Sequence, residues 1–284
     1  MQNVRIVTHS GCDLTFAEAR DNGIVMLPDL VVFGGEQYRN NVDIGPETFY
    51  RRLEEDAVFP TSAHPSLSEF IDAFRAAGDC QDIVCIVMSS KMTGTINTVN
   101  IAAQMLKSEG FGPRIHVYDS RQVSFGMGMA VLSAARMARS GATVDEILAH
   151  LDHLVPRIGV YFVMQSLKYA KKGGRIGAIK ALTADVLGAK PLLVFRDGTV
   201  SDISLNRSFQ AGIQSIFQKY RNLAGDRPEL FIFHACNPEG ALQLRDLILQ
   251  ACPNAQPRIE TVGPVVGTYT GVGCVGIAFE KKEG

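Results

Sequence analysis

The chain has 284 residues, of which 46% are hydrophobic and 20% are charged. This balance excludes intrinsic disorder, collagen-like repeats and coiled coil, and a single core rarely grows beyond about 250 to 300 residues. We therefore expect two lobes with ample cores. The net charge of -1, from 28 basic and 29 acidic residues, gives no overall attraction to nucleic acid or to an anionic membrane.

The N-terminus and the cysteines predict a soluble cytoplasmic protein. The chain opens with MQNVRIVTHS, which reaches a strand-like run within a few residues and has no basic, apolar leader. No apolar run approaches the roughly 18 to 20 residues that span a bilayer. The short apolar runs predict no membrane span. The six cysteines form no CxxC pair and no Cys/His metal spacing, so we expect reduced thiols and no metal.

Apolar, β-branched runs alternate with segments of helical period along the first half of the chain. The strand-like runs occupy 4–10, 24–35, 80–90 and 113–120. Thr15, Ser66 and Thr143 each stand three positions before a glutamate, the capping-box pattern that marks the start of a helix. This alternation predicts an α/β lobe with a mainly parallel sheet, which we place at residues 1–158.

A second lobe, predicted over 159–284, has a mixed pattern of strands and helices. It begins with the strand-like VYFVM after Gly159 and reaches KPLLVFRDGTVSDIS, where Asp197 and Gly198 predict a hairpin turn. Strand-like and helical segments then follow to the closing CVGIAFE. No linker rich in Pro, Gly or Ser separates the halves, so we expect the lobes to pack closely around a cleft that can hold a ligand.

The sequence contains no motif that supports a nucleotide, hydrolase or metal site. GVGCVG at 271–276 matches GxGxxG, but only eight residues follow it, too few for the helix and acidic residue of a dinucleotide site. GGRIGAIK at 173–180 lacks the order of a P-loop, and the chain has neither GxSxG nor HExxH. His150 and His153 lie on a charged amphipathic segment, where the spacing favours solvated surface over a metal site.

Two hydroxyl-rich turns follow apolar strands or precede helices. The first contains Thr61 and Ser62 in FPTSAHPSLSEF, and the second contains Ser89, Ser90 and Thr93 in VMSSKMTGTINT. Serine and threonine at such positions commonly cap helices or form turns. A helix that opens near Thr93 would also point free N–H groups toward the carboxyl end of a sheet, an arrangement that binds anions. For Thr93, capping and anion binding both stay open.

A basic segment around two glycines contains one arginine in an unusual setting. Most lysines of LKYAKKGGRIGAIKA fit a solvated basic loop. Arg175 differs, because it stands between glycines and apolar residues. An arginine in such a place commonly pairs with a specific anion or with a carboxylate.

Several segments occur together in an order and spacing that resemble one known family. They are THSGCDL, TSAHPS, SSKMTGT, DSRQVSFGMG, LKYAKKGGRI, AKPLL and GPVVGTYTGVGCVG, from about Ile6 to Phe279. They are similar to the motifs DSxxDL, TSQPS, SSKLSGT, DSxxVSxGxG, LxYLxKGGRI, IKPIL and GPVIGTHTGPGALG. These motifs belong to the DegV family of bacterial fatty-acid-binding proteins, which includes the lipid-carrying subunits of fatty acid kinase.

The resemblance implies a lipid buried between two α/β lobes, with its carboxylate held by hydroxyls of the TS and SGT motifs. The head-group residues that it implies are Thr61, Ser62, Thr93, Gly94, Arg175 and Tyr269. Thr61 and Thr93 stand at the two hydroxyl positions, while Arg175 and Tyr269 would be supporting donors. Arg207, in LNRSF, matches a surface arginine where a kinase partner would approach.

The same resemblance implies a carrier and not an enzyme. The protein would present a fatty acid to a separate ATP-dependent kinase, which forms the acyl phosphate, and would need no cofactor of its own. An apolar tunnel would hold the acyl chain. Its candidate lining residues, each of which also fits ordinary core packing, are Phe125, Met127, Met129, Phe162 and Met164.

Three positions depart from the family pattern. His9 replaces the leading acidic residue, Thr93 replaces a serine and Tyr269 replaces a histidine, while the TS turn is one residue longer through Ala63 and His64. Threonine narrows the pocket by a methyl group. Tyrosine keeps a donor but cannot become cationic at neutral pH. We expect a carboxylate head group with a shifted preference for the acyl chain.

Two other functions stay open. A hydrolase or acyltransferase on acyl substrates would use Ser89, Ser90 or Cys85 as nucleophile together with a histidine, although no oxyanion motif accompanies them. A carrier of another amphipathic acid, without a kinase partner, would be compatible with His9 and Tyr269. Turnover of acyl esters would separate the enzyme from either carrier.

Overall fold

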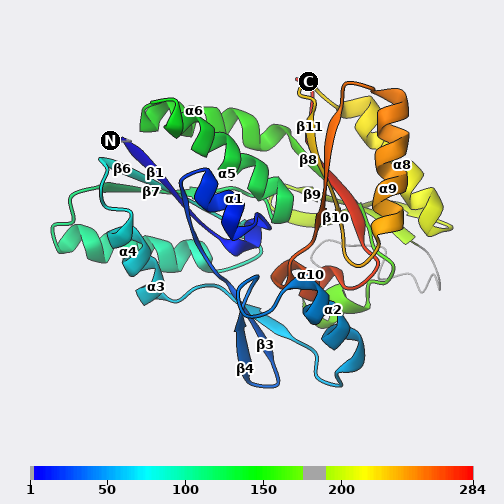
Figure 1. The fold of residues 1–284 in the computed structure, drawn as a ribbon, viewed down its shortest axis with the longest axis horizontal. Helices are drawn as coiled ribbons and strands as arrows, with labels where there is room; N and C mark the ends of the chain where they lie inside the picture. Colours follow the sequence, from blue (N-terminus) through cyan, green and yellow to red (C-terminus); the bar gives the residue numbers. More distant parts are fainter. Residues whose placement is uncertain (1–2, 175–189, 284) are drawn as a thin grey trace.

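The computed structural model describes residues 3–174 and 190–283 of the chain. Its strands form a parallel sheet, a larger mixed sheet and a small antiparallel sheet (Figure 1). Within the described residues, no helix has the length and apolar character needed to cross a membrane. The predicted fold class is confirmed, since the chain has a mixed α/β fold with a parallel sheet and a mixed sheet.

The first sheet is parallel throughout. Its strands, in spatial order, are β2 (Ile24–Leu27), β1 (Val4–His9), β6 (Asp82–Val87) and β7 (Arg114–Asp119). β6 is buried along its whole length, as expected for an apolar strand that is covered on both faces. The surrounding helices are α1 (Phe16–Asp21), α3 (Leu67–Ala76), α4 (Thr95–Ser108), α5 (Ser124–Arg139) and α6 (Val144–Leu154). α3 and α4 cover one face, and α5 covers the other.

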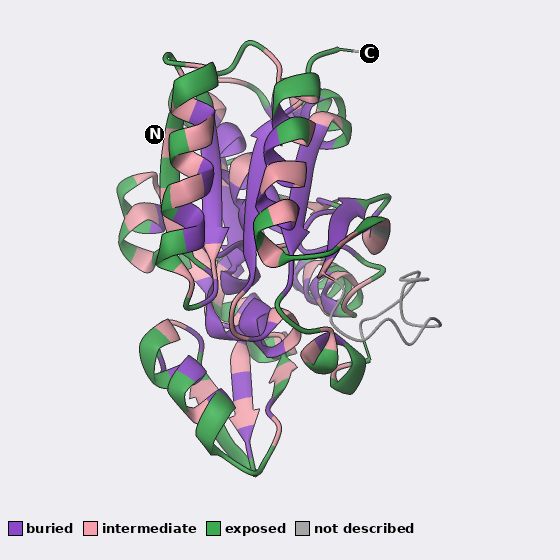
Figure 2. Cartoon of the chain, turned by 90° about the vertical axis from the view of Figure 1, so that its right-hand side faces the viewer, coloured by how far each residue is buried: buried purple, intermediate pink, exposed green. Residues whose placement is uncertain are grey.

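The second sheet is mixed, because only β11 and β12 pair in parallel. Its strands, in spatial order, are β10 (Thr199–Asn206), β9 (Lys190–Arg196), β8 (Ile158–Val163), β13 (Val275–Glu280), β11 (Glu229–His234) and β12 (Gln256–Thr261). Helices α8 (Phe209–Leu223) and α9 (Pro238–Ala251) pack on its outer face. Figure 2 shows the buried strands of this sheet behind helices whose outer sides are exposed.

The sequence predicted one strand over 24–35, but the structure divides this run between the parallel sheet and the small antiparallel sheet. Its strands are β4 (Glu36–Arg39), β3 (Leu30–Phe33) and β5 (Thr61–Ala63), with α2 (Pro46–Glu55) between β4 and β5 in the chain. The chain leaves the parallel sheet at Pro28, because proline has no N–H for the sheet ladder and fixes its own φ. As a result β5, which contains the TS turn, lies against α10 (Pro264–Thr270).

The predicted helix starts and the hairpin are confirmed. The side chains of Thr15, Ser66 and Thr143 each accept a hydrogen bond from the backbone N–H three residues later. Asp197 and Gly198 have φ values of 50° and 80° and connect antiparallel β9 and β10. Two left-handed residues match the twist of the flanking strands, which is why Asp-Gly favours this turn.

Helix α5 joins the two larger sheets. It packs against β1 of the first sheet and against β8 and β13 of the second. Its Phe125 ring stacks on Phe231 and Phe233, with ring centroids 5.2 and 5.6 Å apart. The 3-10 turn η2 (Val155–Arg157) leads from α6 into β8. Because one core cluster continues through α5, the division into domains 1–158 and 159–284 stays a prediction.

Phe125→Ala is expected to lower the free energy of unfolding by about 3–5 kcal/mol, because it empties a buried site between two sheets. Urea unfolding followed by circular dichroism measures the loss. Ile101→Ala, at a side chain that is 51% exposed, is the control, with an expected change within about 0.5 kcal/mol. Equal losses in the two variants would contradict the role given to α5.

Candidate functional site

A cavity of about 220 Å³ lies where the carboxyl ends of β1, β6 and β7 meet β5, α10 and the mixed sheet. Its apolar lining comes mainly from the second half of the chain, through Met88, Met92, Val123, Val160, Phe162, Met164, Ala170, Phe195, Val200, Phe233, Val262, Val265 and Val266. Its polar lining comes mainly from the first half, through His9, Asp29, Ser62, His64, Thr93, Thr95, Ser124, Tyr269 and Thr270. The cavity therefore has an apolar wall and a polar wall.

The residues predicted to line an apolar tunnel divide between cavity and core. Phe162 and Met164 line the cavity. Phe125, Met127 and Met129 do not, because α5 turns them into the packing between the sheets. Helical periodicity identifies these three as apolar positions but does not show which neighbour they meet.

Ser62 and Tyr269 meet across the cavity wall. The Ser62 Oγ lies 2.7 Å from the Tyr269 hydroxyl, which joins β5 to α10. The Tyr269 ring lies over Gly173, just after α7 (Lys168–Lys172), and a Cβ at position 173 would overlap it. Tyr269 therefore lies beside Ser62 of the TS turn, and its role as a supporting donor stays a prediction.

Thr61 does not line the cavity, which corrects its assignment as a head-group donor. Thr61 is exposed, whereas the neighbouring Ser62 is half-buried and lines the wall. Ala63 and His64 line the cavity as well, so its lining along this segment begins at Ser62, one residue after Thr61. The longer TS turn explains the error: counting back from Pro65 of TSAHPS, and not forward from Thr61, aligns Ser62 with the threonine of TSQPS.

Thr93, Gly94 and Thr95 lie where the second hydroxyl-rich turn leads into α4. Helix α4 begins at Thr95, with Gly94 as its N-cap, so Thr93 lies just outside the helix. The Thr95 N–H donates to the Thr93 Oγ1 at 3.3 Å, and the two hydroxyl oxygens are 2.9 Å apart. All three residues line the cavity. Thr93 therefore accepts the first N–H of α4 and also lines the cavity, while anion binding by Thr93 stays a prediction.

His9 is part of a buried network that the sequence did not reveal. Its Nδ1 lies 2.8 Å from Asp29 Oδ2, and its Nε2 accepts the Met88 N–H at 3.1 Å. Because Nε2 accepts a bond, the ring proton is assigned to Nδ1, facing Asp29. Asp29 also accepts bonds from the Ser10 hydroxyl and the Gly11 N–H. The acid of this site is thus at position 29 and the histidine at position 9.

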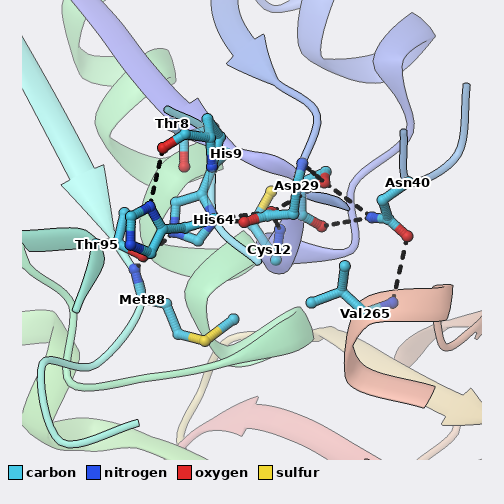
Figure 3. Close-up of polar contacts among 12 residues, drawn as sticks. Thr8, His9, Cys12, Asp29, Asn40, His64, Met88, Thr95 and Val265 are labelled. Atoms are coloured by element: carbon cyan, nitrogen blue, oxygen red, sulfur yellow. Dashed lines mark hydrogen bonds and ion pairs between the residues drawn. The ribbon is translucent and has the colours of Figure 1, made fainter. Parts of the chain in front are cut away.

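This network reaches the second half of the chain through Asn40. The Asn40 amide donates to Ser10 Oγ at 2.8 Å, and its Oδ1 accepts the Val265 N–H at 3.3 Å, near the start of α10. Figure 3 follows His9, Asp29, Asn40 and Val265 along this path. Tyr50 adds a further contact, since its hydroxyl donates to the Val262 carbonyl at 2.9 Å.

Asp13 is a second buried acid beside the cavity. It accepts bonds from the Ser124 hydroxyl at 2.5 Å and from the Gly263 N–H at 3.2 Å. Burial raises the pKa of Asp13 to about 7, although the bonds from Ser124 and Gly263 oppose that rise. Since Ser124 lines the cavity and Gly263 precedes α10, Asp13 connects the cavity wall to that helix.

Two further predicted residues are Arg175 and Arg207. Arg175 lies outside the described residues. Arg207 is exposed between β10 and Ser208, the N-cap of α8, and is not a lining residue of the cavity. Among the described residues, no cluster of three or more His, Cys, Asp or Glu side chains could hold a metal ion.

Of the three residues proposed as nucleophiles, Ser89 and Cys85 are buried, whereas Ser90 is exposed. The Ser89 hydroxyl is buried and donates to the Gly198 carbonyl at 2.7 Å. Cys85 lies inside β6, where burial raises the pKa of its thiol. The Ser90 side chain is exposed, and its backbone N–H donates to Asp119. His9 uses both ring nitrogens in other bonds, so it is not placed to act as a base for any of the three.

Comparison with known proteins gives a consistent result. A family model described as "Uncharacterised protein, DegV family" matches residues 3–282. A DegV domain-containing protein of Caldanaerobacter subterraneus is 30% identical over 99% of this chain and 100% of its own. A solved DegV family protein from Thermus thermophilus, described for its fatty acid binding, is 27% identical with a TM-score of 0.90 and covers 98% of this chain and 99% of its own.

A second solved structure shows the same fold. DegV from Bacillus subtilis, described as a fatty acid binding protein, is 24% identical with a TM-score of 0.86. The similarity covers 99% of this chain and 100% of that one. The fold is therefore shared along nearly the whole length of the chain.

Asp13→Asn is expected to flatten the pH dependence of stability between about pH 4 and the folded pKa of about 7. In that window the folded state holds a proton that the unfolded chain has lost, so the contribution is full below about pH 4 and is lost as the pH rises to 7. Asparagine resembles the protonated acid and does not titrate. Urea unfolding at a series of pH values measures the difference, and parallel profiles for the two proteins would contradict the assignment.

Proposed function

Because the chain belongs to the DegV family, we propose that it binds a long-chain fatty acid in the cavity. The carboxylate would lie at Ser62 and Thr93, and the acyl chain would lie along the apolar wall. The observation that carries this proposal is the pairing of hydroxyl turns with an apolar wall in one cavity. The Thermus thermophilus relative, described for its fatty acid binding, supports the choice of ligand.

The two walls would contribute different parts of the affinity. Each methylene buried on the apolar wall contributes about 0.8 kcal/mol before ordering and association costs. The methionines Met88, Met92 and Met164 can adjust to the shape of the chain because their side chains are unbranched and flexible. The polar wall would fix the orientation, since a buried carboxylate is costly unless it accepts several hydrogen bonds.

The head-group donors in this proposal are hydroxyls and helix-end amides. Ser62 takes the role first given to Thr61, and Thr93 keeps its own. Gly94 stands at the N-terminus of the fourteen-residue α4, where the helix dipole favours a negative charge. Tyr269 would support Ser62, and Arg175 stays a proposed donor from outside the described residues.

The bound acid would be presented to a separate ATP-dependent fatty acid kinase, which would form the acyl phosphate. Resemblance to kinase carrier subunits supports this step, and Arg207 offers an exposed cation for the partner surface. An ATP-dependent partner would place the reaction in the cytoplasm. The carrier itself would need neither a cofactor nor a nucleophile, in agreement with the contacts of Ser89 and Cys85.

Purified protein is expected to release a long-chain fatty acid when it is denatured. Mass spectrometry of the extract identifies the acid, its chain length and its saturation. Protein stripped of lipid should bind one fatty acid per chain. Without a kinase, the protein should not hydrolyse acyl esters. Recovery of no acyl acid, together with failure to bind added acids, would refute the proposal.

Ser62→Ala and Thr93→Val are each expected to weaken fatty acid binding about fivefold to twentyfold, because each removes one hydrogen bond to a charged head group. Thr61→Val is the matched control, since Thr61 is exposed beside Ser62 and outside the cavity. Displacement of a fluorescent fatty acid measures the three affinities. A larger loss in Thr61→Val than in Ser62→Ala would restore the original assignment.

A further inference from the structure

Thr95 differs from the other hydroxyl residues of the cavity in the depth of its burial. Its exposed fraction is 0%, although it stands at the first position of α4 and lines the cavity. Within the described parts of the chain, its hydroxyl has one hydrogen-bond partner, the Thr93 Oγ1 at 2.9 Å. The burial of Thr95 therefore determines how the two hydroxyl protons are arranged.

The hydroxyl protons of Thr93 and Thr95 can be arranged in two ways, and the burial of Thr95 decides between them. If Thr93 donated to Thr95, the Thr95 proton would be buried without an acceptor, which costs free energy. If Thr95 donates to Thr93, its proton is satisfied and no buried group is left unpaired. Thr93 already accepts the Thr95 N–H at 3.3 Å, so both acceptor positions of its oxygen are then occupied.

The second arrangement leaves one role for the Thr93 proton. Because its oxygen accepts two bonds from Thr95, the Thr93 hydroxyl can make a further bond only as a donor. Thr93 is half-buried and lines the cavity, so the ligand space is where that proton can find an acceptor. Successive hydrogen bonds also polarise one another, which strengthens the donor at the end of the chain.

Resting on the proposed function, we infer that Thr95 is a positioning residue that turns the Thr93 proton toward the ligand. The site then favours a head group that only accepts hydrogen bonds, a carboxylate, over one that must also donate, an alcohol. Thr95 itself does not touch the ligand head in this arrangement. Its contribution is to hold a neutral hydroxyl in the donating orientation before the ligand arrives.

Ser124 presents the opposite polarity on the same wall. Its hydroxyl proton is used in the bond to Asp13, so Ser124 offers lone pairs to the cavity. A carboxylate gains nothing from such an acceptor, whereas an alcohol could donate to it. The preference for a carboxylate therefore comes from the donor side of the wall, where Thr93 and Thr95 lie.

Thr95→Val tests the inference, because valine keeps the shape of threonine and removes the hydroxyl. Lipid-free wild type, Thr95→Val and Thr95→Ser are titrated at pH 8 with dodecanoate and with dodecanol, ligands that differ in the head group alone. Thr95→Val should weaken dodecanoate binding about threefold to tenfold, since the Thr93 proton gains three staggered positions in place of one and loses its polarising partner. Dodecanol binding should change less than about twofold.

Thr95→Ser restores the hydroxyl and should return the acid-to-alcohol ratio to that of wild type. Equal weakening of both ligands in Thr95→Val, or unchanged dodecanoate binding, would overturn the inference while leaving the proposed function intact. Thr95→Ala gives a second hydroxyl-free variant if the valine protein does not fold. Wild type that binds neither ligand would overturn the proposed function, and this inference with it.

Discussion

Buried polar side chains from the first half of the chain hold the backbone where α10 begins. Asp13 accepts the Gly263 N–H and Asn40 accepts the Val265 N–H, while Tyr50 donates to the Val262 carbonyl. The first N–H groups of a helix have no partner inside the helix, and a buried group left unpaired is costly. The first half thus supplies the cap that α10 lacks, since Gly263 at its N-cap has no side chain.

The cavity depends on that cap in two ways. α10 carries Val265 and Val266 of the apolar wall as well as Tyr269 beside Ser62, so its position determines the space for both ends of a ligand. One capping residue also contacts the polar wall, because Asp13 accepts a hydrogen bond from the hydroxyl of Ser124, which lines that wall. Packing through α5 brings the sheets together, and the polar contacts then fix the angle at which α10 closes the cavity.

The sequence predicted the parts of the fold that are encoded locally. Alternating apolar runs and capping boxes located the parallel sheet and its helices, because these signals depend on near neighbours in the chain. The split at Pro28 was missed, since both halves of the run are apolar and only tertiary pairing separates β2 from β3. The bond from His9 to Asp29 could not be predicted either, because it joins side chains twenty residues apart through a turn of unknown direction.

The sequence located turns that line the cavity, but not always the residue of each turn that does so. Motif similarity located the TS turn, yet the extra residue shifted the alignment, and only the structure shows that the cavity lining includes Ser62 and not Thr61. Thr95 was missed because a threonine at the start of a helix has no distinguishing pattern. The close approach of Tyr269 to Gly173 also constrains how such a site can diverge. A side chain at position 173 would overlap the Tyr269 ring where it now lies, so a lineage that enlarges Gly173 must either move that ring or replace the tyrosine with a smaller residue.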